Sequence, residues 1–204
     1  MVELTEIPAG NLSLSKRKPL YGVGINDSNY VVSRKGAACS YYKVWKGVIE
    51  RCYSKKFHDK YPSYIGCTVC DEWLLFSNFK SWMQSQDWKG KQIDKDILVQ
   101  GNKMYSPSNC IFVTHAVNSL FTCRERKRGK YNQGVHVGTN TKKYKAQCSY
   151  LGVINRLGTF DSEKEAFDVY KKFKYGVIRE LALDQDEPLR SAMLNYKIIQ
   201  SKGA

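Results

Sequence analysis

The residues with the clearest potential for chemistry lie in one stretch, residues 92–121, "QIDKDILVQGNKMYSPSNCIFVTHAVNSLF". An acid, Asp94, ends a short apolar strand, and a loop rich in Gly, Asn, Ser and Pro follows. A second apolar run then leads into a helix that carries Asn118. A strand–loop–strand–helix unit of this kind can hold one divalent cation between an acid on the first strand and an Asn on the helix. The stretch therefore predicts a candidate metal site.

The residue beside the acid limits what such a site can do. A lysine at its ordinary pKa is protonated near neutral pH, so Lys95 cannot take a proton from water, although it could hold an anionic phosphate. A base would have to come from elsewhere, and a histidine or tyrosine in a basic loop more often contacts phosphate or solvent. The candidates are His115 at the helix start, His58 in the preceding loop, Tyr64 and Tyr105.

The charge balance indicates the class of partner. The chain has 33 Lys and Arg against 19 Asp and Glu, a formal net charge of +14. Such an excess on a folded chain is typical of a protein that binds a polyanion. The basic residues are interleaved with Tyr, Asn and Gln on strand-like segments, and no basic amphipathic helix of the membrane-surface kind is present. Nucleic acid is therefore favoured over an anionic membrane or solubility alone.

Composition also bounds the architecture. At 204 residues, with 42% hydrophobic and 13% aromatic residues, the chain can form one large folded domain or two small ones. The longest apolar runs, "EWLLF" and "CIFV", are too short to span a bilayer, and the N-terminus has no apolar core of a signal peptide. We therefore expect a soluble cytoplasmic protein with no membrane partner.

The seven cysteines are expected to be reduced thiols rather than a disulfide framework. Cys67 and Cys70 form the one metal-like CxxC pair. A structural zinc needs four ligands, and no second CxxC or CxxH completes the set, so zinc is not favoured there. Distant thiols that could contribute are Cys52, Cys110 and Cys123.

The N-terminal part of the chain reads as a tail followed by short elements. Residues 1–20 are polar and are expected to form a flexible tail, and residues 21–36 predict one or two short strands. Apolar residues at helical spacing predict a helix over 41–52 and a second one over 73–83. Between them, 55–70 is expected as a basic loop punctuated by Pro and Gly.

A basic run over 124–133, "RERKRGKYNQ", predicts a linker between a module at 21–123 and a second module at 134–182. In the second module, three short alternating strands precede a helix opened by Ser162 and Glu165 as a capping box. The expected fold class is α+β, with a three-stranded antiparallel sheet packed on one helix. The last residues, 183–204, are expected as a tail with one short helix.

The pattern "GVHVGTNTKKYKAQCSYLGVINRLGTFDSEKEAFDVYKKF" resembles the AP2-type DNA-binding domain over residues 133–182. The most specific part is "LGTF" leading into an acidic-capped helix. The resemblance implies that one face of the sheet contacts double-stranded DNA in the major groove. The residues that it implies are Gln133, His136, Asn140, Tyr144, Gln147, Ser149 and Arg156. Independently of the resemblance, the basic linker predicts phosphate contacts from Arg124, Arg126, Lys127, Arg128 and Lys130. A solvated sheet face remains the structural alternative.

Residues 41–121 resemble the HNH (ββα-metal) endonuclease superfamily in its phage version, on "VWKGVIERCY", "YIGCTVCDEW", "FSNFKSW", "IDKD" and "YSPSNCIFVTHAVN". The resemblance implies that Asp94 and Asn118 bind the metal and that Asn109 pins the loop. The hard oxygen ligands suit Mg²⁺ or Mn²⁺. It also implies a base histidine where Lys95 stands, so the module is a degenerate one.

The two resemblances together predict a phage-type DNA endonuclease, of the homing kind. Its C-terminal sheet would recognise the site, and its N-terminal module would hydrolyse a phosphodiester bond with a metal ion. The main alternative is a catalytically inactive DNA-binding protein that acts as a regulator or as an antagonist of host factors. An RNA-binding protein is a third alternative, disfavoured because both resembling modules act on duplex DNA.

Overall fold

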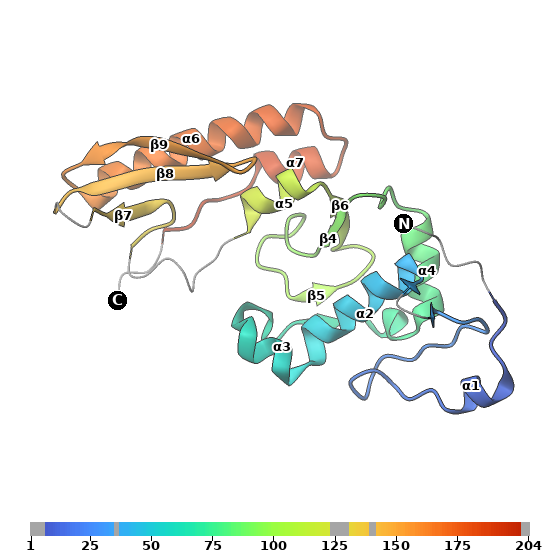
Figure 1. The fold of residues 1–204 in the computed structure, drawn as a ribbon. Helices are drawn as coiled ribbons and strands as arrows, with labels where there is room; N and C mark the ends of the chain where they lie inside the picture. Colours follow the sequence, from blue (N-terminus) through green and yellow to red (C-terminus); the bar gives the residue numbers. More distant parts are fainter. Residues whose placement is uncertain (1–6, 35–36, 123–130, 139–141, 201–204) are drawn as a thin grey trace. The chain divides into compact units, whose positions relative to one another are not determined.

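The computed structural model describes residues 7–34, 37–122, 131–138 and 142–200, and the chain divides into two units, Met1–Phe112 and Val113–Ala204 (Figure 1). Each unit combines helices and strands, so the chain has the predicted α+β class. In the part of the chain that the structure describes, no helix is both long and apolar enough to cross a membrane.

Unit 1 is built from short elements joined by turns. Its helices are α1 (Asn11–Ser15), α2 (Ser40–Tyr53), α3 (Lys55–Lys60) and α4 (Phe76–Gln84), with 3-10 turns η1 (Pro62–Tyr64) and η2 (Asp71–Leu74). Its strands are β1 (Ser33–Arg34), β2 (Ala37–Ala38), β3 (Thr68–Val69), β4 (Gln92–Asp94), β5 (Met104–Tyr105) and β6 (Ile111–Val113), whose last residue opens unit 2. β1 pairs antiparallel with β2, and β3 pairs parallel with β5.

The two predicted helices of unit 1 are confirmed, and they form its core. On α2 the buried residues are Trp45, Val48, Ile49 and Cys52, at the spacing that puts them on one helix face. The second predicted helix splits, because Trp73 lies in η2 and only the residues from Phe76 onward are α-helical. The Trp45 ring nitrogen donates to the Trp73 carbonyl oxygen at 2.7 Å, which ties the two segments together.

Two expectations for unit 1 need correction. The predicted loop at 55–70 begins with helix α3, because the Ser54 hydroxyl accepts a hydrogen bond from the Phe57 amide at 3.2 Å and caps it. The predicted tail, where described, contains α1 and is tied to the chain after it. Arg17 donates to the Tyr30 carbonyl oxygen at 2.8 Å.

Unit 2 contains helix α5 (His115–Phe121), strands β7 (Val135–Val137), β8 (Tyr144–Tyr150) and β9 (Val153–Phe160), and helices α6 (Glu163–Leu183) and α7 (Leu189–Leu194). We expected α5 in the N-terminal module, but it belongs to unit 2, where the Phe121 ring lies 4.7 Å from that of Tyr196. The unit therefore begins before the predicted linker, of which residues 124–130 lie outside the described residues.

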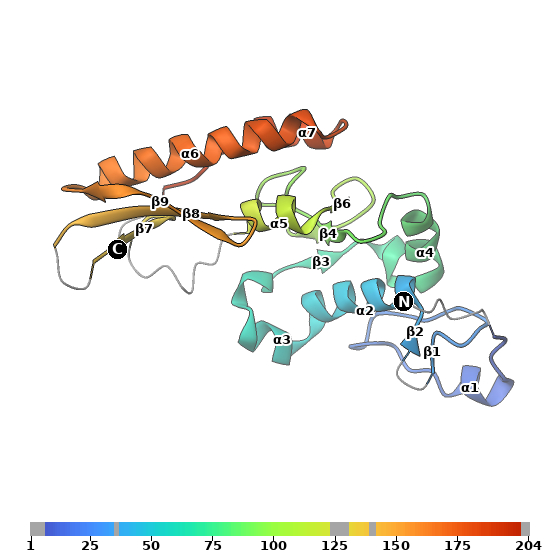
Figure 2. The ribbon, with the colours of Figure 1, turned by 45° about the horizontal axis from the view of Figure 1, so that its top comes forward.

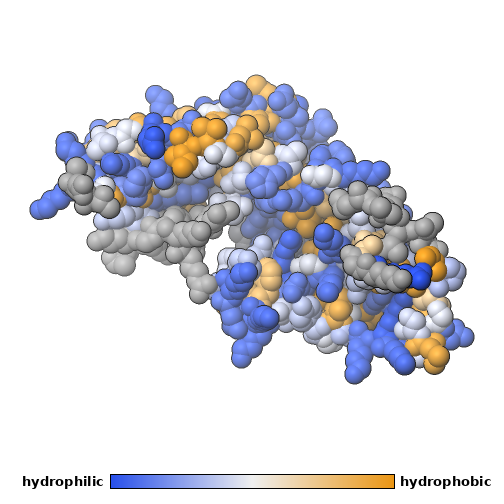
Figure 3. Space-filling view, in the orientation of Figure 1, coloured by the Kyte–Doolittle hydropathy of each residue, from blue (hydrophilic) through white to orange (hydrophobic). Residues whose placement is uncertain are grey.

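The predicted three-stranded antiparallel sheet is confirmed, in the order β7–β8–β9, and α6 runs along one of its faces (Figures 1 and 2). The Ser162 hydroxyl caps α6 by accepting from the Glu165 amide at 3.2 Å. The core between sheet and helix consists of Val135, Ala146, Cys148, Ala166, Phe167 and Tyr170, with Ile198 from the chain end. Hydrophilic side chains cover much of the visible surface of both units, as the charged composition leads one to expect (Figure 3).

The contact between Gly134 and Tyr170 fixes the start of β7 on α6, and it gives a stability prediction. Gly134 has a φ of +79°, and a Cβ built there would lie 2.1 Å from the Tyr170 ring. Gly134→Ala is therefore expected to destabilise the protein by about 3 kcal/mol or more, since it adds both backbone strain and a clash that a packed core cannot absorb. Denaturant unfolding followed by circular dichroism measures this loss.

Gly152 provides the matched control. Its φ of +78° is nearly the same, but nothing lies within 4 Å of a Cβ built there. Gly152→Ala should therefore lose only the strain, about 1–2 kcal/mol. Equal losses of unfolding free energy for the two variants would show that the contact with Tyr170 does not restrict the residue at position 134.

Candidate functional site

The sheet of unit 2 has one face that carries most of the residues predicted to contact DNA. Side chains alternate along a strand, and Ala146 and Cys148 of β8 are buried against α6. Lys145, Gln147 and Ser149 therefore point to the opposite side. We call this side the outer face; its described residues are His136, Lys145, Gln147, Ser149, Ile154, Arg156 and Thr159.

Strand pairing arranges the outer face in three rows. His136, Lys145 and Thr159 are opposite one another across β7, β8 and β9, Gln147 is opposite Arg156, and Ser149 is opposite Ile154. Residues directly opposite each other in a sheet lie on the same face. The structure thus brings four predicted residues, His136, Gln147, Ser149 and Arg156, onto one surface.

A β-bulge decides that Arg156 belongs to this surface. The register shifts between Ala146, which pairs with Gly158, and Gln147, which pairs with Arg156, so Leu157 is the extra residue on β9. Gly158 permits the distortion, since its φ of +134° lies in a region that favours glycine. Leu157 packs against the core under the sheet. Without the bulge, Arg156 would share the face of Gly158 and point at the helix.

The other predicted contacts lie away from the outer face or outside the described residues. The Tyr144 ring packs against the core cluster, 5.8 Å from the Tyr131 ring, so Tyr144 does not share the outer face. The alternation of β8 explains this, because Tyr144 has the same parity as the buried Ala146. Gln133 lies in the turn before β7, half-buried. Asn140 and the basic residues Arg124, Arg126, Lys127, Arg128 and Lys130 lie outside the described residues.

Asp94, the predicted metal-binding acid, ends β4 and caps the turn that follows it. Its Oδ1 accepts hydrogen bonds from the amides of Asp96 at 2.9 Å and Ile97 at 2.7 Å. Burial, together with the neighbouring Asp96 carboxylate, raises the pKa of Asp94 to about 6. Two amide bonds on one oxygen leave acceptor sites on the carboxylate, so this use does not conflict with a hard cation.

Lys95 is turned inward, not toward solvent. Its side chain is buried, and Nζ donates to Asp96 Oδ2 and to the Asn102 carbonyl oxygen, both at 3.0 Å. Burial alone would lower the pKa of Lys95, but the Asp96 carboxylate, together with Cys67 and Asp94, has the opposite effect and the pKa is raised. The ammonium therefore stays protonated and cannot act as a base, and its bonds favour a structural role over the predicted grip on phosphate.

Asn102 holds the loop, a role that sequence reasoning had given to Asn109. Its Nδ2 donates to the carbonyl oxygens of Lys95 at 2.6 Å and Met104 at 2.7 Å, and its Oδ1 accepts from the Met104 amide at 3.1 Å. Asn109 joins this network through its own Nδ2, which donates to Asn102 Oδ1 at 3.2 Å. The Gly101–Asn102 pair is typical of a turn, so the sequence could have indicated a structural role for Asn102 in this loop.

The remaining predicted site residues are distributed over both units. His115 is the exposed first residue of α5 and Asn118 is half-buried on the same helix, in unit 2, whereas Asp94 belongs to unit 1. The joint role of Asp94 and Asn118 as metal ligands stays a prediction. Among the alternative bases, the ring nitrogen Nε2 of His58 donates to the Arg51 carbonyl oxygen at 2.9 Å. Burial raises the pKa of Tyr105 far above neutrality, so its phenol holds its proton.

The described cysteines are free thiols. Cys67 is buried and Cys70 half-buried, and burial raises the pKa of both. Cys52 and Cys110 are buried, each with a pKa raised to about 12 for the same reason. Within the described ranges, no group of three or more His, Cys, Asp or Glu side chains is arranged to hold a metal ion.

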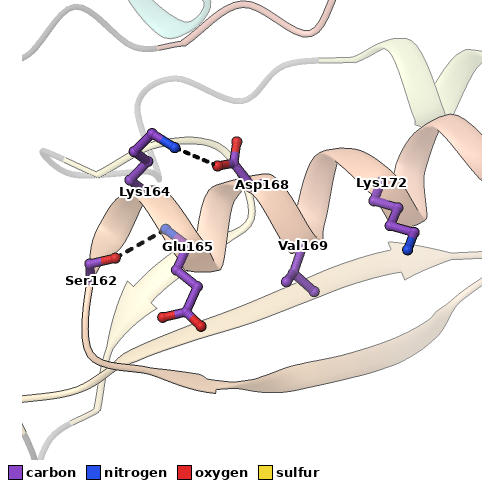
Figure 4. A pocket seen from close by; sticks show the side chains of 6 residues that line it. All are labelled: Ser162, Lys164, Glu165, Asp168, Val169 and Lys172. Atoms are coloured by element: carbon purple, nitrogen blue, oxygen red, sulfur yellow. Dashed lines mark hydrogen bonds and ion pairs between the residues drawn. The ribbon is translucent and has the colours of Figure 1, made fainter.

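A surface hollow lies beside the first turns of α6 (Figure 4). Three of its polar residues bond within the helix, since Lys164 pairs with Asp168 at 3.1 Å and the Ser162 hydroxyl caps the helix. Hydrogen bonds from Lys171 and Lys164 lower the pKa of Asp168. These contacts describe a solvated helix face, so the hollow is not a candidate ligand site.

The environment of Asp94 predicts that this acid lowers the stability of the protein at neutral pH. Its folded pKa of about 6 lies above the ordinary value of 3.8, so its contribution to stability is lost as the pH rises from about 4 to about 6. Asp94→Asn keeps an Oδ1 for both turn amides and removes the half-buried charge. We expect a gain of about 1–3 kcal/mol in the free energy of unfolding at pH 7.5, and a flatter stability profile between pH 4 and 6.

Asp94→Ala distinguishes the effect of the charge on stability from the effect of the capping hydrogen bonds. It removes the charge and the acceptor together, and it should be about 1 kcal/mol less stable than the asparagine variant. An asparagine variant that is less stable than the wild type at pH 7.5 would contradict the view that the half-buried Asp94 carboxylate costs stability.

No family model matches this chain, and neither the curated proteins nor the solved structures contain a protein that matches it. The resemblances to the AP2-type domain and to the HNH superfamily therefore rest on the residues that suggested them. What the chain does has to be inferred from the outer face and from the loop around Asp94.

Proposed function

We propose that this protein binds duplex DNA through the outer face of the β7–β8–β9 sheet. The observation that carries the proposal is the common orientation of His136, Gln147, Ser149 and Arg156, with Lys145 among them. A sheet face that only contacts solvent would not need Arg, Gln, His and Lys side chains gathered on it. The net charge of +14 supports a polyanionic partner.

The chemistry of the outer face suits base recognition. A β-ribbon fits the major groove, where an Arg can bond guanine and a Gln can bond adenine through two hydrogen bonds each. Arg156 and Gln147 are opposite each other, so they would reach neighbouring bases. Lys145, His136 and Ser149 can bond phosphates or base edges. Further phosphate contacts would come from the basic run at 124–130.

The second candidate is the one to which the HNH-like pattern points, a metal-dependent DNA endonuclease. The elements β4, β6 and α5 occur in the predicted order, with the short strand β5 in the segment between β4 and β6, and Asp94 ends β4. An acid kept there at a cost in stability is typical of functional sites. Asp94 and Asn118 would hold Mg²⁺ or Mn²⁺, which when bound polarises a phosphodiester and stabilises its leaving group. An inactive DNA-binding protein is the alternative if no residue supplies a base.

The first test measures duplex binding by fluorescence anisotropy at several salt concentrations. Arg156→Ala is expected to weaken binding roughly tenfold, and to reduce the slope of log K against log salt by up to about 0.9 if the arginine also neutralises a phosphate. Gln147→Ala should weaken binding with little change in that slope, because glutamine carries no charge.

Arg179→Ala is the matched control, because it removes the same charge from an exposed position on α6, outside the outer face. Equal losses for Arg156→Ala and Arg179→Ala would mean that total charge governs binding and that the outer face has no special role. Tighter binding to structured RNA than to duplex DNA would favour the RNA-binding alternative.

The second test asks for nicking of supercoiled plasmid DNA with Mg²⁺ or Mn²⁺. If the protein is a nuclease, Asp94→Asn abolishes nicking while it preserves the fold and duplex binding, because only the metal-binding charge is lost. Wild-type protein that binds the plasmid and leaves it intact with both metals would assign it to the inactive DNA-binding class.

A further inference from the structure

The outer face contains one apolar side chain among polar and charged ones. Ile154 is 56% exposed, opposite Ser149 and two residues from Arg156 on the same strand. The bulge at Leu157 puts Ile154 on this face together with Arg156. Ile154 is not part of the core cluster between the sheet and α6. Its position is set by strand pairing, and it has no packing role under the sheet.

The chemistry of the major groove offers one apolar partner at this place. Each base pair presents hydrogen-bond donors and acceptors there, and thymine alone adds a C5-methyl group. Two residues along a strand span about 7 Å. The spacing of bases along one DNA strand is about 3.4 Å, so Ile154 would lie within about two base pairs of the base that Arg156 contacts.

We propose that Ile154 contacts the C5-methyl group of a thymine and so contributes to the choice of binding site. This inference rests on the proposed function, because it requires the outer face to lie in the major groove. It adds an apolar contact to the polar ones from Gln147 and Arg156. The outer face would then favour sites with a thymine next to the bases read by those two residues.

The test removes one methyl group at a time. Duplexes that bind the full-length protein are first enriched from a random pool, and each thymine of the best duplex is then replaced singly by deoxyuridine. At one thymine, the replacement should weaken wild-type binding about three- to fivefold, the effect of one buried methyl group. Ile154→Ala should bind the thymine and deoxyuridine duplexes equally at that position.

Val153→Ala is the matched control. Val153 is 61% exposed and adjacent in sequence, but it is opposite Tyr150 and therefore lies on the other face of the sheet. This variant should keep the wild-type preference for thymine. Both substitutions remove a β-branched side chain from an exposed strand position, so their effects on folding should match, and circular dichroism checks this.

Different results overturn different parts of the proposal. If the wild type binds an enriched duplex but no deoxyuridine replacement matters, or if Ile154→Ala keeps the preference, the role of Ile154 is wrong and duplex binding stands. If Ile154→Ala abolishes a concentration-dependent self-association of the wild type and leaves the thymine preference unchanged, Ile154 contacts a second copy of the chain instead. If the wild type binds duplexes but enriches none over the others, the role of Ile154 is wrong and duplex binding stands; if it binds no duplex at all, both the role of Ile154 and the proposed function fail.

Discussion

The two-faced geometry of β9 is the constraint on which the proposed interface depends. A strand assigns each side chain to one of two faces, and the bulge at Leu157 changes that assignment once, between Gly158 and Arg156. At the bulge itself, the Leu157 side chain packs against the core under the sheet. Beyond it, Arg156 and Ile154 point outward. Both the arginine and the isoleucine therefore depend on one glycine with an unusual φ.

The loop around Asp94 depends on a different kind of stabilisation. It is held by polar bonds, with Asp94 capping the turn, Lys95 joined to Asp96, and Asn102 joining both ends of the loop. Such a network loses stability when a partner of Lys95 is removed, because the buried ammonium is then left with an unmade hydrogen bond. It also holds an acid at a raised pKa, which a loop selected for stability alone would not need.

The elements with strong local signals could be predicted from sequence. The apolar spacing of α2 and the Ser162 cap of α6 act within a few residues, and both are confirmed. The bulge in β9 could not be predicted, because it depends on the pairing of β9 with β8. The same holds for Asn102, whose partners are set by the folded loop. Strand alternation does explain the position of Tyr144, since it shares the parity of the buried Ala146.

Lys95 also determines what a histidine at its position would change in the loop. Its ammonium reaches both Asp96 and the Asn102 carbonyl oxygen, and an imidazole ring is shorter and cannot make both bonds in the same way. A histidine at this position would supply a base, and at the same time the loop would lose the hydrogen bonds that Lys95 makes to Asp96 and to the Asn102 carbonyl oxygen. Substituting histidine for Lys95 would therefore place an imidazole beside Asp94 and remove the hydrogen bonds that hold the loop. Loop stability and a base beside Asp94 thus make opposite demands on the residue at position 95.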